Sequence, residues 1–264
     1  MQPEPTYVYV VGESRSGSTV VGRILAQSND GVMLGEVARL PELATDHQAS
    51  CTCGAGVGSC PEWSKALDYL DGQPIRPAKR SGEYSPARAL VQSVLLVLGF
   101  RTRSARARAR RHHGVLELMA HRGGISSYLV DTSKKPDLAV TLVRCTQANV
   151  KIVRVRRHGA GIVASVVPRG NATLPRALFR LLLARARIAV LLWWIPANRL
   201  HTVWYEDVIE QAATQGVTVT AGDHELGGTD HVSTDFTVDR RYETELPAWL
   251  VPVVGRVAGR RRSA

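Results

Sequence analysis

The feature that most constrains the fold is a glycine-rich loop between an apolar run and a helix-like segment near the N-terminus. The run covers residues 7–12 and reads YVYVVG, a composition typical of a buried strand. Residues 19–27 read TVVGRILAQ, with apolar positions at helical spacing. Residues 12–19, which we call the phosphate loop, lie between them. This order predicts backbone N–H groups and a helix N-terminus gathered around a bound anion.

The spacing of the phosphate loop matches that of the P-loop, G-x-x-x-x-G-K-[ST], with one change. Ser18 stands where the P-loop has its lysine. A nucleoside triphosphatase needs that lysine against the charge of the β- and γ-phosphates, so its loss argues against hydrolysis of ATP or GTP. Arg15 supplies a cation three residues earlier. Two interpretations stay open here, a site for another phosphate-containing donor and an ordinary Gly/Ser-rich turn.

Strand-like and helix-like segments alternate along the rest of the chain. The further strands are predicted at residues 32–35, 128–131, 151–157 and 201–205, and helices at residues 136–146, 161–167 and 172–198. This alternation favours an α/β fold with a central parallel sheet between helical layers. We treat residues 1–264 as a single domain with two insertions, a flap at residues 45–63 and a helical cap at about residues 72–125.

The stretch Arg15-Ser-Gly-Ser-Thr19 resembles the 5′-phosphosulfate loop of bacterial-type sulfotransferases that use 3′-phosphoadenosine 5′-phosphosulfate (PAPS). Members share the P-loop topology and typically carry [KR]-[SG]-G-[ST]-[ST] here. The resemblance implies a P-loop-like, three-layer α/β fold and PAPS as co-substrate. Arg15 would hold the phosphosulfate and the charge that develops on the leaving phosphate, together with N–H groups of the loop. The residues assigned to the donor are Arg15, Ser16, Gly17, Ser18 and Thr19.

A second anion site is predicted where the strand at residues 151–157 ends. An arginine at a strand end and a serine on the next helix can converge on one phosphate. Arg157 and Ser165 are eight positions apart, which is similar to the family's 3′-phosphate signature. The family often reads R-[DN]-P-R here, whereas this chain reads RHGA from Arg157. The alternative is a basic strand end at the surface.

Two later segments also resemble the family. The segment that begins at His224 is similar to an H-x-x-x-G-N segment bordering the nucleotide, and it assigns Gly228 and Thr229 to the donor site. Thr229 replaces the usual Asn, and Val232 stands where an arginine is usual. A Y-E-D strand end is a structural landmark of the family. The residues we therefore expect to serve the scaffold are Tyr205, Glu206 and Asp207.

Two strand ends carry the predicted acceptor side. Glu36 follows the strand at residues 32–35, and a carboxylate there can take the proton of an attacking hydroxyl. Carbohydrate and tyrosyl sulfotransferases carry a proposed base at a similar Gly-Glu; a Glu favoured by a helix N-terminus is the alternative. The DTSK stretch from Asp131 resembles the family's D-[ST]-S-K. Ser133 and Lys134 would orient the sulfonate or the bridging oxygen, and Asp131 is either a second candidate base or a turn former.

Three cysteines, Cys51, Cys53 and Cys60, lie in the flap. The segment resembles C-x-C-G…C-x-x-W stretches of bacterial sulfotransferase-like proteins. The spacing also suits a zinc site that lacks one ligand, which His47 would supply. We favour a substrate-facing flap with free or paired thiols, and we expect no metal in the site or in the reaction.

The excess of basic residues points to anionic partners. Lys and Arg number 34 and Asp and Glu number 23, so the net charge is +11. The expected cap holds an apolar helix at residues 87–100 and an arginine-rich run at residues 101–111. Nucleic acid and anionic lipid are candidate partners of this run, but a solvated helix face is the commoner use of such a sequence. We predict no specific nucleic-acid partner.

No secretory signal is apparent, and the longest apolar stretches, at residues 89–100 and 188–195, are shorter than the roughly 20 residues that span a bilayer. We expect a cytoplasmic protein and leave contact with a membrane surface open. The predicted function is sulfuryl transfer from PAPS to a hydroxyl of a small-molecule, carbohydrate or glycolipid acceptor. The alternatives are a P-loop-type kinase or other nucleotide-dependent transferase, and a non-enzymatic module that binds nucleic acid or membranes.

Overall fold

The computed structural model describes residues 5–72, 94–96, 98–99, 102–121, 128–167, 173–227, 238, 240, 242–245 and 254. Its centre is a five-stranded sheet in the order β2-β3-β1-β4-β5, with every neighbouring pair parallel. The strands are β1 (Thr6–Gly12), β2 (Val32–Gly35), β3 (Tyr128–Asp131), β4 (Val150–Arg156) and β5 (Leu200–Trp204). The predicted α/β class with a central parallel sheet is confirmed, and each predicted strand lies within one residue of an observed one.

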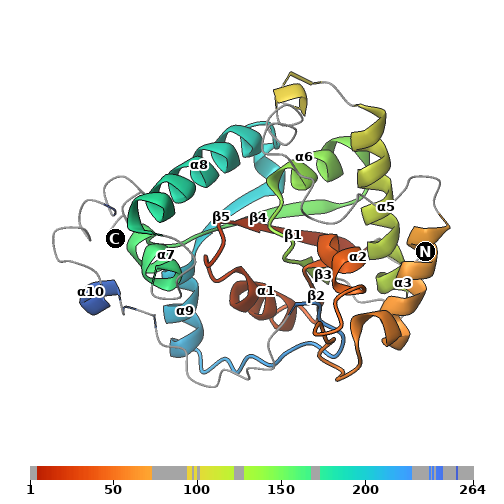
Figure 1. The fold of residues 1–264 in the computed structure, drawn as a ribbon, viewed down its shortest axis with the longest axis horizontal. Helices are drawn as coiled ribbons and strands as arrows, with labels where there is room; N and C mark the ends of the chain where they lie inside the picture. Colours follow the sequence, from red (N-terminus) through yellow and green to blue (C-terminus); the bar gives the residue numbers. More distant parts are fainter. Residues whose placement is uncertain are drawn as a thin grey trace.

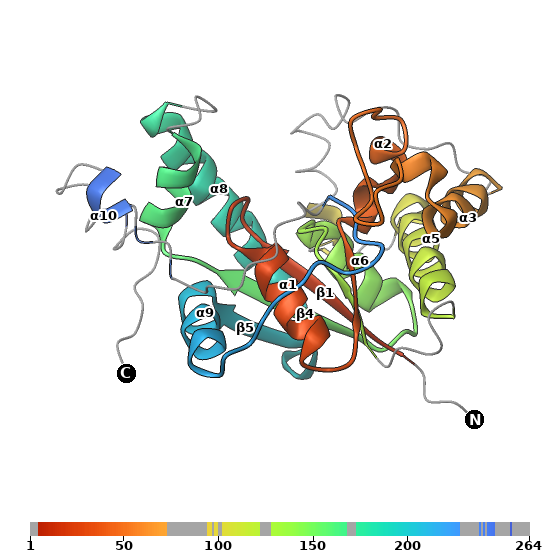
Figure 2. The same cartoon turned by 90° about the horizontal axis from the view of Figure 1, so that it is seen from below.

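Helices cover both faces of the sheet, so the molecule has three layers (Figures 1 and 2). One face packs against α1 (Ser18–Gln27) and α9 (Tyr205–Thr214). The other face carries α5 (Arg103–Ala120), α6 (Pro136–Cys145) and α8 (Leu174–Leu192), and α7 (Gly159–Val166) packs on α8. The remaining helical elements of the described residues are η1 (Val37–Arg39), α2 (Leu40–Leu43), η2 (Val57–Ser59), α3 (Pro61–Asp71), η4 (Ala197–Arg199) and α10 (Tyr242–Glu245).

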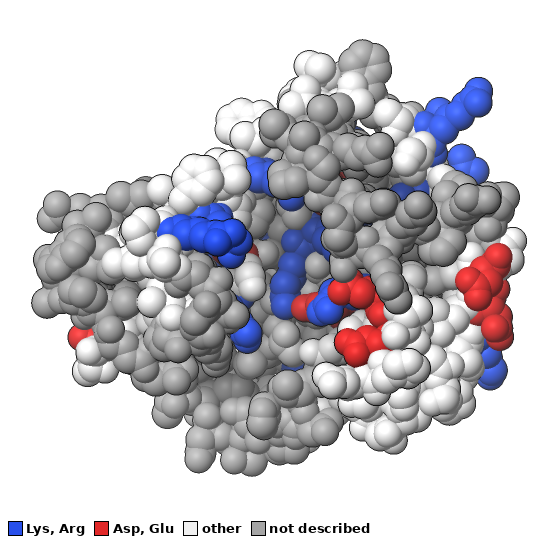
Figure 3. Space-filling model, viewed as in Figure 1, with Lys and Arg blue, Asp and Glu red and all other residues white. Residues whose placement is uncertain are grey.

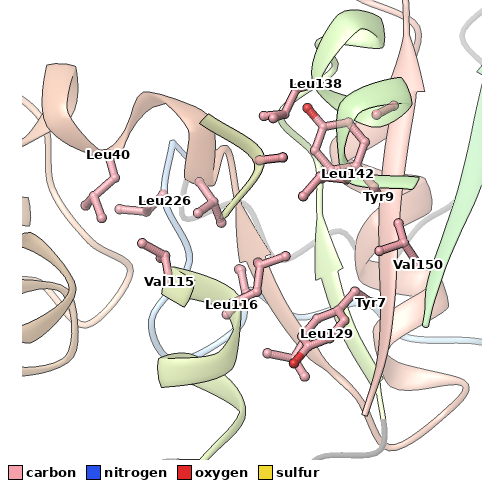
Figure 4. Close-up of a cluster of buried hydrophobic side chains, with 14 of the residues drawn as sticks. Tyr7, Tyr9, Leu40, Val115, Leu116, Leu129, Leu138, Leu142, Val150 and Leu226 are labelled. Carbon is pink, nitrogen blue, oxygen red and sulfur yellow. The ribbon is translucent and has the colours of Figure 1, made fainter. Parts of the chain in front are cut away.

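The larger core lies between the sheet and the layer of α5, α6 and α8. Figure 4 shows alternate side chains of β1 pointing into this core beside apolar residues of α5 and α6. Alternation along a strand explains why Tyr7 and Tyr9 face this layer while Val8 and Val10 face α1. The residues labelled in Figure 4 are Tyr7, Tyr9, Leu40, Val115, Leu116, Leu129, Leu138, Leu142, Val150 and Leu226.

The arginine-rich part of the expected cap belongs to this layer. The arginine-rich run falls on α5, whose Ala109, Val115 and Leu116 are buried in the main core. Arg108 Nη1 donates to Asp137 Oδ2 on α6 at 2.6 Å, so one arginine of the run joins two helices. Of the helix expected at residues 87–100, the described residues are 94–96, which are helical, and 98–99; the others lie outside the described residues.

The register of the sheet brings the candidate residues to one edge. Gly12 pairs with Val155 of β4, and Tyr9 pairs with Asp131 of β3. The last residues of β1, β3 and β4 therefore end at the same carboxyl edge, where open α/β sheets bind their ligands. Among the described residues, no helix is both long enough and apolar enough to cross a membrane.

Candidate active site

The phosphate loop is held in a shape that needs glycine at its last turn. Gly17 precedes α1 with φ at 81°, and Arg15 also has a positive φ, at 66°. A Cβ atom on Gly17 would lie 2.1 Å from the ring of Tyr205, so the absence of a side chain allows this packing. Tyr205 thus supports the loop from β5 and α9, which agrees with its predicted scaffold role.

The start of α1 presents hydrogen-bond donors at the carboxyl edge. N–H groups in the first turn of a helix have no carbonyl partner within the helix, which leaves those of Ser18 and Thr19 free of the helical ladder. Ser16 differs from the expectation, because its N–H donates to Glu13 O at 3.1 Å. Its Oγ, by contrast, is buried and unpartnered. Ser16 therefore presents neither its N–H group nor its hydroxyl at the surface of the loop.

Arg157 connects the second predicted anion site to the phosphate loop. Its Nη1 donates to the carbonyl oxygen of Arg15 at 3.0 Å, and its guanidinium lies over the Tyr205 ring at 4.8 Å. A Cβ on Gly161 would lie 3.1 Å from Arg157 Nε, so the Arg157 side chain packs against the first turn of α7. Ser165 is one turn further on the same side of α7. Its Oγ donates to Ile162 O at 2.8 Å, so donation to a phosphate requires the hydroxyl to rotate.

Positive charge exceeds negative charge under this edge. Arg185 of α8 lies 3.1 Å from the buried Glu13 carboxylate, without the alignment of a hydrogen bond. Burial lowers the pKa of Arg154 and of Arg185, and the charge of Glu13 partly opposes the shift in both. Figure 3 shows basic side chains near the middle of the molecule in that view, with acidic side chains beside them. Such an edge favours an anionic ligand.

Glu36 lies between two cations. Lys134 Nζ donates to its Oε1 at 2.7 Å, and Arg39 Nη1 donates to its Oε2 at 2.8 Å. Burial raises the pKa of Glu36, but the charges and hydrogen bonds of Lys134 and Arg39 outweigh it and hold the pKa below its usual value. The structure thus brings together two of the predicted catalytic residues, with the carboxyl group in its ionised form.

Asp131 and Ser133 are structural residues of the β3 turn. His112 of α5 donates to Asp131 Oδ2 at 2.6 Å, and Ser133 N donates to Asp131 Oδ1 at 2.8 Å. Ser133 Oγ also donates to Asp131 and accepts from Ala38 N. Asp131 is buried and both of its carboxylate oxygens have hydrogen-bond partners, which favours the turn former of its two predicted roles. The Ser133 hydroxyl is likewise engaged within the protein, and its contact with the sulfonate stays a prediction.

Glu206, a second residue of the predicted Y-E-D landmark, also has a scaffold role. Glu206 Oε1 accepts from His158 N at 2.8 Å, which ties the end of β4 to the start of α9. His158 stacks on Tyr242 with ring centroids 5.1 Å apart. The end of β4 is therefore fixed to the start of α9 and to α10.

Residues 222–227, which we call the edge segment, run beside the end of β2. Leu226 N donates to Leu34 O, and Glu36 N donates to Leu226 O, both at 3.0 Å. Glu225 is fully buried and accepts two hydrogen bonds from Arg23 of α1, at 2.8 and 3.2 Å. The edge segment therefore holds Glu36 and α1 together. Sequence reasoning missed this ion pair, because nothing in either local pattern connects residues so distant.

The flap and the edge segment meet at four side chains. Cys51, Cys53, Cys60 and His224 have their ligand atoms within 4.8 Å of one another. His47, the predicted fourth ligand, is exposed and is not in this group. His224, which opens the segment that the sequence predicts to border the nucleotide, faces the cysteines. Gly228 and Thr229, assigned to the donor from the same segment, lie outside the described residues.

Comparison with known proteins adds a likeness of fold at low similarity. No protein-family model and no curated protein sequence matches the chain. It is similar to the sulfotransferase domain from the curacin biosynthetic pathway, with 14% identity and a TM-score of 0.48 over 98% of this chain and 99% of that chain. The sulfotransferase domain of the Synechococcus PCC 7002 olefin synthase has 16% identity and a TM-score of 0.44, over 81% and 71% of the two chains.

A sulfotransferase from Alicyclobacillus acidocaldarius has 12% identity and a TM-score of 0.38, over 98% of both chains. At such low identities and TM-scores, these likenesses say nothing about donor or acceptor.

Proposed function

We propose that the chain is a sulfotransferase that moves a sulfuryl group from PAPS to an acceptor hydroxyl. The observation that carries the proposal is the hydrogen bond from Arg157 to the carbonyl oxygen of Arg15, at 3.0 Å. It joins the phosphate loop to the end of β4, and in this proposal the two together form one two-part anion site. A donor with phosphates at both its 5′ and 3′ ends suits such a site better than a donor with a single phosphate chain.

The phosphate loop holds the 5′ end of the donor in this proposal. The first-turn N–H groups of α1 donate to phosphosulfate oxygens, and Arg15 balances charge that grows on the leaving phosphate. Arg157 and Ser165 bind the 3′-phosphate, through N–H groups of the guanidinium and a rotated hydroxyl. Neither binding contact requires a triphosphate or the P-loop lysine that Ser18 replaces.

Glu36 is the base at the acceptor side. Its ionised carboxylate takes the proton as the acceptor oxygen bonds to sulfur and the bond from sulfur to the bridging phosphate oxygen breaks. The products are the sulfate ester, adenosine 3′,5′-bisphosphate and the proton on Glu36. Lys134, which donates to Glu36 at 2.7 Å, stabilises negative charge on the transferred group when the carboxylate gains its proton.

The test compares two variants for transfer from radiolabelled PAPS to a panel of phenols, sugars and glycolipids. Glu36→Gln keeps the size of the side chain and removes the base, so turnover falls by about 10²–10⁴ while affinity for adenosine 3′,5′-bisphosphate is kept. Arg15→Ala loses both turnover and that affinity. Near-normal turnover of Glu36→Gln removes Glu36 from the role of base.

Labelled ATP with Mg²⁺ and the same acceptors serve as the comparison. Transfer from ATP, and none from PAPS, overturns the proposal in favour of a kinase. Binding of DNA or anionic vesicles that weakens steeply with salt, together with no response to either nucleotide, favours the non-enzymatic alternative.

A further inference from the structure

The flap and the edge segment bring four metal-ligand side chains together at tetrahedral separations. Cys53 Sγ lies 3.7 Å from Cys60 Sγ, and His224 Nδ1 lies 3.3 Å from Cys60 Sγ and 3.8 Å from Cys51 Sγ. In a tetrahedral zinc site with bonds of about 2.3 Å to sulfur and 2.0–2.1 Å to nitrogen, these separations are about 3.8 Å and 3.6 Å. Three of the six separations are therefore near those of a tetrahedral site, and all six are within 4.8 Å.

We propose that Cys51, Cys53, Cys60 and His224 bind a zinc ion. Three thiolates and one imidazole are a ligand set that structural zinc sites use, and soft sulfur ligands favour zinc over magnesium or calcium. Zinc binding displaces the thiol protons to solvent, and no electron is transferred. Four protein ligands fill the coordination shell, so the ion has no open position for a substrate and its role is structural.

The backbone around the cysteines forms a defined turn. Gly54 has φ at 87°, Cys51 N donates to Ala55 O at 2.8 Å, and Gly54 N donates to Cys51 O at 2.9 Å. This tight turn returns Cys53 toward Cys51, and the Cβ-free position at Gly54 permits its left-handed backbone. Cys60 precedes α3 and is fully buried.

The histidine side of the set is held as firmly. Trp63 Nε1 donates to His224 O at 3.1 Å, and Glu225 N donates to Thr52 Oγ1 at 2.8 Å. Thr52 Oγ1 also donates to Gly222 O. Figures 1 and 2 both show the blue chain before residue 228 beside the orange flap. These contacts fix ligands from two distant parts of the sequence before any ion binds.

The ion would fasten the elements that position Glu36. His224 is followed by Glu225, which pairs with Arg23 of α1, and by Leu226, which pairs with the backbone of Glu36. Zinc would therefore join the flap to both α1 and the candidate base. This inference does not depend on sulfuryl transfer, since a structural ion would serve the same fold with any ligand.

Metal analysis of the purified full chain tests the proposal directly. We expect about one equivalent of zinc per chain by inductively coupled plasma mass spectrometry. The melting temperature should fall once a chelator removes the zinc. Cobalt added to the stripped protein should give the visible bands of a tetrahedral ion and a thiolate-to-cobalt charge-transfer band. Zinc should bleach both.

Two pairs of variants separate this site from other cysteines and histidines. Cys60→Ser and His224→Gln should each weaken zinc binding by more than about 100-fold, beyond what outer-shell changes cause. Cys145→Ser and His47→Gln are the matched controls and should keep full zinc content, since neither residue belongs to the set. His47→Gln also tests the ligand that the sequence alone suggested.

The outcomes that overturn the proposal are also distinct. A chain that neither contains zinc nor takes up zinc or cobalt under reducing conditions has no metal site. A disulfide between Cys53 and Cys60 that persists in protein prepared under reducing conditions makes the pair a structural disulfide instead of zinc ligands. Because the cobalt spectrum is read on the wild-type chain, a variant that fails to fold does not decide the matter. Adenosine 3′,5′-bisphosphate binding tests the sulfotransferase proposal separately.

Discussion

At the scale of single residues, Glu36 shows how a candidate base is kept ionised in a partly buried place. Burial alone would raise its pKa and favour the protonated form, which cannot accept a proton. Lys134 and Arg39 reverse this effect, and both reach it from turns at the carboxyl edge of the sheet. The ionised state of Glu36 thus depends on its neighbours more than on its own exposure.

Lys134→Met should raise the pKa of Glu36. The substitution removes an opposite charge and a hydrogen bond at 2.7 Å, while burial, which acts in the other direction, persists. NMR titration of the labelled Glu36 side chain measures the change. Lys135→Met is the control, because Lys135 Nζ contacts Ala38 O instead of the carboxylate.

The same change should alter stability against pH with a definite sign. A carboxyl whose folded pKa lies below its usual 4.5 stabilises the fold above that value and loses the contribution as pH falls through the folded pKa. As the pH falls from 5 to the acid transition, the free energy of unfolding of Lys134→Met should therefore decrease less than that of the wild-type chain. An unchanged acid transition, with an unchanged Glu36 titration, would show that Lys134 does not control this carboxyl.

Residue roles could be predicted from sequence where a short motif fixes the local backbone. Gly17 and Arg15 lie in the turn that the loop pattern predicts, and Glu36 and Lys134 meet because two strand ends share an edge. Asp131 could not be assigned, since its partner His112 comes from a helix whose arginine-rich sequence suggests solvent. The contacts of His224 could not be predicted for a similar reason, because its neighbours lie in the flap, far away in the sequence.

At the scale of elements, the Arg23–Glu225 pair connects α1 to the edge segment. Both side chains are almost completely buried, at 5% and 0% exposure, and two hydrogen bonds join them. Such a pair contributes little over an apolar pair of similar volume, but a single buried partner left alone is very unfavourable. The pair therefore specifies how α1 meets the edge segment.

Arg23→Met should destabilise the chain by about 3–5 kcal/mol, because it leaves the Glu225 charge buried without a partner. Urea unfolding measures the loss. The double variant Arg23→Met with Glu225→Leu should recover most of it, since both charges are then absent. As a control, Arg240→Ala breaks an exposed pair with Glu210 and should cost under about 1 kcal/mol. Equal losses in the single and double variants would contradict this account.

Elements were predicted well where the apolar period is strong. The strands of the sheet and helices such as α1 and α6 follow from continuous apolar runs and from spacing. The placement of α5 could not be read in this way, because its N-terminal half is rich in arginine and its buried face is small. Only packing against α3 and α6 reveals it as part of the main layer.

At the scale of the whole molecule, one face of α8 carries several large exposed apolar side chains. Phe179, Leu183, Val190 and Trp193 are 67%, 59%, 54% and 84% exposed, and their spacing of three, four or seven residues puts them in one stripe. Exposed arginines of the same helix lie near its start. Aromatic residues with adjacent basic charge, on a chain of net charge +11, suit the surface of an anionic membrane.

We predict that the chain binds vesicles containing phosphatidylserine and binds neutral vesicles more weakly, with a loss of binding as salt is raised. Replacing Phe179 and Trp193 together by Ser should reduce binding to the anionic vesicles, as measured by co-sedimentation, without lowering the melting temperature. Equal binding of wild type and variant would contradict a membrane-facing stripe. Loss of a dimer in the variant would assign the stripe to a second copy of the chain.

The measurement that tests the central claim most directly is the shift in melting temperature with adenosine 3′,5′-bisphosphate, beside 5′-AMP and Mg-ATP. A ligand at about 100 times its Kd adds about 2.7 kcal/mol, or roughly 5–10 °C for a domain of this size. The two-part anion site predicts a shift of this order with the bisphosphate and little with 5′-AMP, and loss of the shift in Arg157→Ala. An equal shift with 5′-AMP, or a larger one with Mg-ATP, would contradict it.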